Sequence, residues 1–237
     1  GLLEEQASTL EMSPETIMAL ATTIYFRAKW ASEFSESATS EGLFHTLSAD
    51  GEDITCDFMH QSGTRNYYWS DKFSAVAQRL ESSGNMWFIL PDEDVSVDEL
   101  LSDSKTVDFI LADGDWENSK FLTVNLSLPK FDVVSDTDIV PALKKLGITD
   151  VFDAGTSDFT PMTTDTDEIF LSKARHAARV TVDEEGVAAA AYTVMMAAGS
   201  AMPPDEEIDF TVDRPFIFAI TGADGLPLFV GVVNNPA

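Results

Sequence analysis

Apolar and polar side chains alternate along residues 121–134, and this alternation constrains the fold more than any other feature of the chain. A period of two is the spacing of a β-strand that has one buried and one exposed face. The segment is therefore predicted to form a long half-buried strand, interrupted at Pro129 because proline lacks a backbone N–H. The predicted buried face carries Leu122, Val124, Leu126 and Leu128, and the opposite face carries Thr123, Asn125 and Ser127.

Short β-branched or aromatic runs between turn signals predict further strands along the chain. Residues 86–90 are continuously apolar, which is typical of a strand that is covered on both faces. Helices are expected over 96–112, where apolar side chains recur at helical spacing, and over 138–146, which Gly147 closes. The remaining predicted strands span 19–26, 52–60, 65–69, 73–80, 169–182, 208–210, 214–221 and 228–233. No repeat or linker divides the chain, so we expect one sheet-dominated α+β domain over residues 1–237.

The chain carries 41 Asp and Glu residues against 14 Lys and Arg residues, a formal net charge of −27 at pH 7. A surface of this sign repels nucleic acid and anionic membranes, so we expect neither as a partner. No apolar run approaches the ~18 residues of a membrane span, and no signal peptide is visible. The acidity fits either an acidic secreted protein or adaptation to high salt, and thermal unfolding in low and molar salt separates the two.

Cys56 is the single cysteine, which excludes an internal disulfide framework and any zinc site built on cysteines. The three histidines, His45, His60 and His176, are far apart in the sequence and lack the spacing of metal ligands. We therefore expect no metal and no cofactor. An enzyme built on Ser172 and His176 is not expected either, because the chain has no Gly-x-Ser-x-Gly nucleophile elbow.

Residues 183–205 match neither helix nor ordinary strand patterning. An acidic pair and Gly186 precede the small residues 187–191, and Pro203 and Pro204 follow later. On composition alone, the segment is a short alanine-rich surface helix that ends at Gly199.

Residues 184–193 (EEGVAAAAYT) resemble the hinge of the serpin family, in which Glu-Glu-Gly precedes a small residue and an alanine run. The match covers nearly all 237 residues, and the motifs follow in the family's order, which argues against coincidence. The chain therefore resembles the carboxy-terminal portion of a prokaryote-like serpin. The other matching motifs are IYFRAKW at 24–30, LPKF at 128–131, LGITDVF at 146–152, SKARH at 172–176, DRPFIF at 213–218, and Gly231 with Asn235 and Pro236.

This resemblance implies a serpin-like α+β fold, dominated by β-sheet, with a mobile reactive-centre loop. It also implies that the family's amino-terminal helical portion is absent from this chain. We expect that portion of the same protein to be a partner, because the apolar face of the central sheet needs a cover.

The implied function is suicide inhibition of a serine protease, outside the cell, and not enzymatic catalysis. A protease cuts the bait loop, residues 187–202, and the cut loop then inserts as a strand into the central sheet. Family spacing puts the reactive bond between Ser200 and Ala201, with cleavage after Met196 as the nearest alternative. Small side chains around this bond suit an elastase-like or subtilisin-like protease, whereas a trypsin-like pocket needs Arg or Lys.

Insertion requires a hinge that fits inside a sheet, and the hinge implied by the resemblance is largely uncharged and small. A charge at an inward position would cost several kcal/mol if it were buried unpaired. The hinge comprises Glu184, Glu185, Gly186, Val187, Ala188, Ala189, Ala190 and Ala191. Alternation points Val187, Ala189, Ala191, Thr193 and Met195 inward, and Ala188, Ala190, Tyr192 and Val194 outward.

The resemblance also implies a sheet-opening region. Lys130 matches the partner of Glu184 in an ion pair at the top of the central sheet, and Trp30 matches the aromatic residue beside the entry point. His176 matches a histidine under this region, and Thr22 stands where the family has an asparagine, which leaves the hydrogen bonding there open. Without the motifs, Lys130 and Glu184 would be two solvated charges, and Trp30 and His176 would be structural.

Two classes other than an inhibitor or an enzyme stay open. A non-inhibitory serpin would act as a binding or chaperone-like protein, and the uncharged hinge argues against it. An extracellular β-rich adhesion domain would explain the acidity and the strands, but not the alanine segment.

Overall fold

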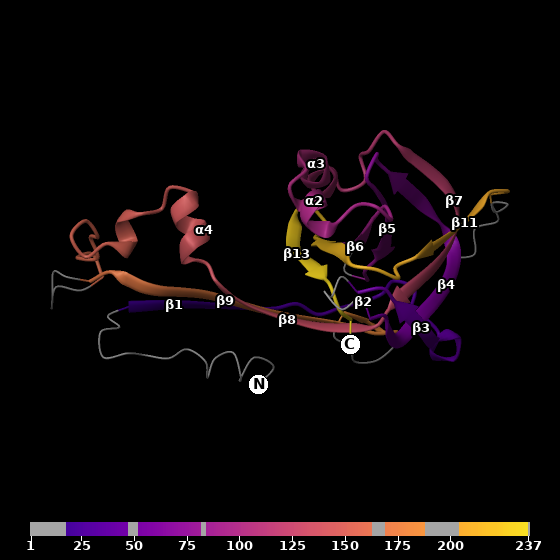
Figure 1. Ribbon diagram of the computed structural model, residues 1–237, viewed down its shortest axis with the longest axis horizontal. Helices are drawn as coiled ribbons and strands as arrows, with labels where there is room; N and C mark the ends of the chain where they lie inside the picture. The colour runs from indigo at the N-terminus through magenta and orange to yellow at the C-terminus, as the bar shows by residue number, and fades with distance from the viewer. Residues whose placement is uncertain (1–17, 47–51, 82–83, 163–168, 188–203, 237) are drawn as a thin grey trace. The chain divides into compact units, whose positions relative to one another are not determined.

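The computed structural model describes residues 18–46, 52–81, 84–162, 169–187 and 204–236 (Figure 1). The chain forms two compact units. Unit 1 contains Gly1–Tyr25 and Val133–Val180, and unit 2 contains Phe26–Asp132 and Thr181–Ala237. This division does not test whether the two units form the single domain that the sequence predicted, so the single domain stays a prediction. In the described part of the chain, no helix is both long and apolar enough to cross a membrane.

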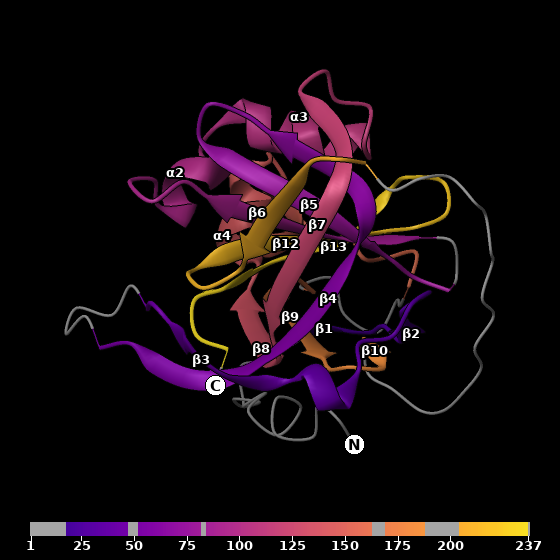
Figure 2. The ribbon, with the colours of Figure 1, turned by 90° about the vertical axis from the view of Figure 1, so that its right-hand side faces the viewer.

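Unit 2 is built on an eight-stranded sheet in the order β11-β7-β4-β5-β6-β12-β13, with β3 paired to β4 (Figure 2). The long strands β4 and β7 run antiparallel, from the pair Phe58↔Pro129 to the pair Tyr68↔Ser119. The bounds are β3 Ser40–Phe44, β4 Ile54–Trp69, β5 Phe73–Arg79, β6 Asn85–Pro91, β7 Ser119–Pro129, β11 Glu207–Thr211, β12 Phe216–Thr221 and β13 Pro227–Val233.

The alternation of residues 121–134 is realised in β7, and its predicted apolar face is buried. The strand ends at Pro129, and β8 (Phe131–Asp138) begins after Lys130, which confirms the predicted interruption. The predicted pair over 73–80 and 86–90 is also confirmed, as the antiparallel strands β5 and β6. Both faces of β6 are covered, as its continuous apolar run indicated.

Two predicted boundaries in unit 2 were wrong. The strands predicted over 52–60 and 65–69 are one strand, β4, because β7 pairs with it across Gly63 without a break. The helix predicted over 96–112 is two helices, α2 (Val97–Leu101) and α3 (Ser104–Ala112). Asp103 separates them by capping α3, since its side chain accepts a hydrogen bond from the Lys105 backbone N–H.

In unit 1, β1 (Met18–Tyr25) pairs in parallel with β9 (Leu171–Val182), and β8 pairs with β9 as well (Figure 1). The predicted short helix is α4 (Val140–Lys145), and Gly147 follows it with a φ of 89°, in the left-handed region that favours glycine. Two short 3-10 helices complete the described elements, η1 (Glu36–Ala38) in unit 2 and η2 (Asp150–Phe152) in unit 1.

Candidate functional site

A tight turn in unit 2 carries the chain from the end of β9 into the predicted hinge. The Asp183 carboxylate accepts hydrogen bonds from the backbone N–H groups of Glu185 and Gly186, at 3.0 and 3.1 Å. The Asp183 backbone N–H donates to the Gly186 carbonyl at 3.0 Å. These bonds reverse the chain and aim the next residues back along β9.

The two hinge residues after Glu184 and Glu185 already form a strand. β10 (Gly186–Val187) runs antiparallel to β2 (Ala28–Lys29), with Gly186 opposite Lys29 and Val187 opposite Ala28. On its other side, Val187 pairs with Val182 of β9, and its side chain is 0% exposed. Val187 is therefore paired on both edges, and both residues of β10 are buried.

Glycine is required at position 186 because the backbone of β2 comes so close. A Cβ there would overlap the carbonyl oxygen of Ala28 and would lie 2.7 Å from the Cα of Lys29. Neither is a movable side-chain atom, so no larger residue fits without separating β10 from β2.

Trp30 lies directly beside the turn and holds it through three kinds of contact. Its indole N–H donates to the Asp183 carbonyl at 2.9 Å, and its backbone N–H donates to the Glu185 carbonyl at 3.1 Å. The ring is 1% exposed and meets the Phe34 ring edge to face, with centroids 6.0 Å apart. The Phe34 backbone N–H in turn donates to the Glu184 carbonyl at 2.9 Å.

Lys130 and Glu184 form the ion pair that the resemblance implied, with Nζ and Oε2 3.0 Å apart. The Thr39 hydroxyl also donates to the Glu184 carboxylate, at 2.8 Å. Burial opposes the charge of Glu184, but the hydrogen bonds from Thr39 and Lys130 outweigh it and lower its pKa. The hydrogen bond to Glu184 likewise raises the pKa of Lys130. Both charges are thus stabilised in the folded state.

Thr22 and His176 meet in unit 1 as register partners on β1 and β9. The Thr22 Oγ1 lies 2.9 Å from the His176 Nδ1 and 3.4 Å from the Arg175 carbonyl oxygen. Threonine therefore bonds the histidine directly, although the family's motif has an asparagine at this position. The sequence had left this hydrogen bond open.

The direct pairing of β1 with β9 also describes the state of this part of the sheet. It runs from Met18↔Leu171 to Tyr25↔Arg179, so no other strand lies between them over these residues. An inserted strand at this place would have to replace these hydrogen bonds.

Several predicted site residues lie outside the described residues. They are Ala188, Ala189, Ala190 and Ala191 of the hinge, and Ser200 and Ala201 of the reactive bond. Among the residues brought together in unit 2, sequence reasoning missed Thr39 and Asp183. Asp183 had a local signal, since aspartate often caps a turn two residues on, whereas Thr39 lies 145 residues from Glu184 and had none.

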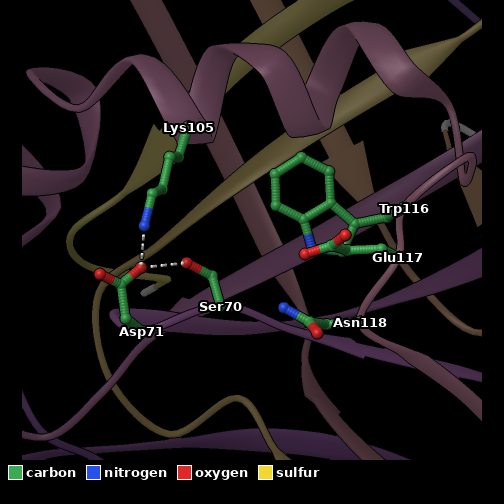
Figure 3. Close-up of a pocket in the computed structure, with 6 residues that line it drawn as sticks. All are labelled: Ser70, Asp71, Lys105, Trp116, Glu117 and Asn118. Carbon is green, nitrogen blue, oxygen red and sulfur yellow. Dashed lines mark hydrogen bonds and ion pairs between the residues drawn. The ribbon is translucent and has the colours of Figure 1, made fainter.

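A hollow in unit 2, of about 370 Å³, is lined by charged and polar side chains and by Trp116 (Figure 3). Lys105 and Asp71 form an ion pair there, with Nζ and Oδ1 2.9 Å apart. The hydrogen bonds from Lys105 and Ser70 lower the pKa of Asp71 to about 2. The Asp71 carboxylate thus balances the charge of Lys105 within the hollow. In the described part of the chain, no cluster of three or more His, Cys, Asp or Glu residues is placed to hold a metal ion.

Comparison with known proteins places these features in a family context. The family model for serpins (serine protease inhibitors) matches residues 2–236. Alpha-1-antitrypsin of Meriones unguiculatus is 32% identical over 241 residues, which cover 100% of this chain and 55% of that protein. The leukocyte elastase inhibitor of Homo sapiens is 31% identical over 100% of this chain and 63% of that protein. The chain spans about half the length of the curated relatives that head the comparison.

Solved structures that resemble this fold also belong to the serpin family. The solved structure of a serpin from the trematode Schistosoma haematobium matches with a TM-score of 0.78 and 28% identity. The match covers 95% of this chain and 59% of that structure. It confirms the predicted fold class, α+β and dominated by sheet.

Proposed function

Because the chain belongs to the serpin family, we propose that the protein is a suicide inhibitor of serine proteases. Its bait loop, residues 187–202, is cut by the protease between Ser200 and Ala201, and the acylated loop then inserts as a strand into the central sheet. The protein acts outside the cell, and its partner is an elastase-like or subtilisin-like protease. The proposed role is inhibition of an enzyme and not catalysis.

The observation that carries this proposal is the pairing of β10. Gly186 and Val187 are the first residues of the insertion path, and Val187 is hydrogen-bonded between β2 and β9 with its side chain fully buried. Insertion then only extends an existing strand and avoids the cost of nucleating a new one. The buried side chain of Val187 also agrees with the inward parity that alternation gives this residue.

The register of β10 supports the path of the following residues. Val187 faces Ala28 and Val182 in the antiparallel sense, and antiparallel partners shift by one residue in opposite directions. Thr193, six residues further along the loop, would therefore face Thr22 and His176. Those two residues pair with each other across β1 and β9 in the closed sheet. We infer that Thr193 takes its place between them when the loop inserts.

The energy available from insertion is large enough to drive the mechanism. A strand of about fifteen residues that gains roughly 0.5–1.5 kcal/mol for each net hydrogen bond contributes on the order of 10 kcal/mol. The hydrogen bonds between β1 and β9 oppose insertion, because they break first. They supply a kinetic barrier that keeps the uncut loop outside the sheet.

A denaturing gel with mass spectrometry tests this function. The full protein is mixed separately with an elastase-like and a subtilisin-like serine protease. A covalent complex at the summed mass, with release of a peptide that starts at Ala201, is the expected result. The same proteases with a blocked active-site serine should give neither product, because the acyl bond needs that serine.

Cleavage without a covalent complex would contradict inhibition of these proteases. It would favour the alternative, a non-inhibitory serpin that acts as a binding or chaperone-like protein. A complex accompanied by a peptide that starts after Met196 would keep the function and move the reactive bond.

A further inference from the structure

A second hollow in unit 2, of about 330 Å³, opens over the strands β4 and β5. Residues 61–65 of β4 and residues 77–79 of β5 form its wall, and Ala31 and Ser32 close one side. Two arginines line it, Arg65 and Arg79.

Neutral amides hold the Arg65 guanidinium in place. Its Nη1 donates to the Gln78 Oε1 at 2.7 Å, and its Nη2 donates to the Gln61 Oε1 at 2.9 Å. Gln78 is buried and donates to the Ser32 carbonyl at 2.9 Å. Gln61 is fixed as well, because its Nε2 donates to the carbonyls of Ser32 and Glu33, at 3.1 Å each. The guanidinium therefore has one orientation before any ligand arrives.

No carboxylate in the described part of the chain forms an ion pair with Arg65 or Arg79. The hollow of Figure 3 differs in this respect, because its cation, Lys105, forms an ion pair with Asp71. Burial lowers the pKa of Arg65, as expected for a charge that lost water and gained no anion. Guanidinium groups nevertheless stay charged in proteins.

Arg65 also keeps unused hydrogen-bonding capacity. A guanidinium carries five N–H donors in a planar fork, and two of its nitrogens each make one of the bonds above. The remaining donors match the two oxygens of a carboxylate, which a fork binds through parallel hydrogen bonds.

We propose that this hollow binds the carboxylate group of a small organic anion, with Arg65 as the fork. The site is separate from the hinge and needs no protease. The negative field of the whole chain opposes an approaching anion, so binding is expected to be measurable only where salt screens that field, at about 0.15 M ionic strength.

Thermal unfolding of the full protein in increasing succinate, with potassium chloride adjusted to constant ionic strength, tests the site. A ligand that binds the folded state raises the midpoint in proportion to the logarithm of one plus its concentration over Kd. Wild type should show this rise, and Arg65→Gln should weaken succinate binding about tenfold or more, because charge-assisted hydrogen bonds are lost. Arg79→Gln should weaken it less, because Arg79 follows Gln78 on β5 and strand alternation points its side chain to the other face.

Arg27→Gln is the matched control, because Arg27 is exposed and does not line the hollow. It removes the same charge and should bind succinate as wild type does. Equal succinate binding by the Arg65→Gln, Arg27→Gln and wild-type proteins would overturn the proposal, as would a wild-type midpoint that does not respond to succinate. If Arg65→Gln fails to fold, succinate binding by Arg65→Lys tests the site, with Arg79→Gln as the comparison. The lysine keeps the charge without the fork and should bind more weakly than wild type, and equal binding by both variants and wild type would overturn the site.

Discussion

Thr22 and His176 face each other across the parallel strands β1 and β9, with the Oγ1 of one 2.9 Å from the Nδ1 of the other. Thr22→Val keeps the shape of the side chain and removes this hydrogen bond. We expect the free energy of unfolding to fall by about 1 kcal/mol, because a half-buried ring nitrogen loses its partner. Chemical denaturation measures this loss. Thr23→Val is the control, since Thr23 is exposed, and an equal effect of both substitutions would contradict a specific role for the Thr22 bond.

The ion pair at the hinge predicts a dependence of stability on pH. The pKa of Glu184 is lowered from its usual 4.5, so its stabilising contribution is complete above pH 4.5 and disappears as pH falls through the lowered value. Glu184→Gln should cost about 1 kcal/mol at neutral pH. Its difference from wild type should shrink below pH 4.5, as measured by denaturant unfolding.

The raised pKa of Lys130 gives the complementary prediction at high pH. Its contribution is complete below 10.5 and is lost as pH rises through the raised value, so the same difference should also shrink in strong base. Glu41→Gln, at an exposed position of β3, is the control and should show neither change. A Glu184→Gln effect that stays constant from pH 3 to pH 11 would rule out the ion pair as its source.

Gly186→Ala should separate β10 from β2. The added Cβ would meet the backbone of Ala28 and Lys29, and overpacking against atoms that do not yield costs about 1–3 kcal/mol or more. Thermal unfolding measures the loss. Gly63→Ala is a matched strand control, since its Cβ would meet only the end of the Arg65 side chain, at 3.6 Å. Comparable stability of the two variants would refute the steric argument.

Charge placement in the hinge tests loop insertion, and this prediction rests on the proposed function. Ala189→Glu puts a charge at an inward position, and Ala190→Glu puts the same charge at an outward one. The first should convert the inhibitor into a plain substrate, because a buried unpaired carboxylate costs several kcal/mol. The second should still form the covalent complex on a denaturing gel. Val187→Arg should act as Ala189→Glu does, and a stable complex formed by either inward variant would refute insertion.

Local patterns in the sequence predicted most strands, because the causes of these strands lie within a few residues. The alternation in β7 and the apolar run in β6 are examples. The ends of strands and helices were harder to predict from the sequence. The sequence predicted two strands, over 52–60 and 65–69, but the pairing of Gly63 with Val124 on β7 keeps β4 continuous between them. No local signal reports a partner 61 residues away.

Contacts between residues far apart in the sequence also explain which parts of the hinge site and of the Arg65 hollow the sequence did not predict. Lys130 and Glu184 lie 54 residues apart, and only the family motifs connected them before the structure did. Arg65 and Gln78 belong to no motif that the sequence offered. The pairing of β4 with β5 ends at Tyr67↔Val76, and Arg65 and Gln78 lie two residues beyond it on the two strands, where their side chains meet. A register of this kind follows from the assembled sheet and not from either strand alone.

The place of β12 in the sheet has a consequence for how cells make this protein. β12 lies between β6 and β13, yet it is translated near the carboxy-terminal end of the chain, long after β6. At about 5–20 residues per second, the ribosome needs roughly ten seconds to reach it from β6. Throughout this interval the apolar strand β6 has one open edge, on which strands of other nascent chains can pair. Slow translation or early termination before residue 216 should therefore lead to aggregation, and a chaperone that covers β6 should prevent it.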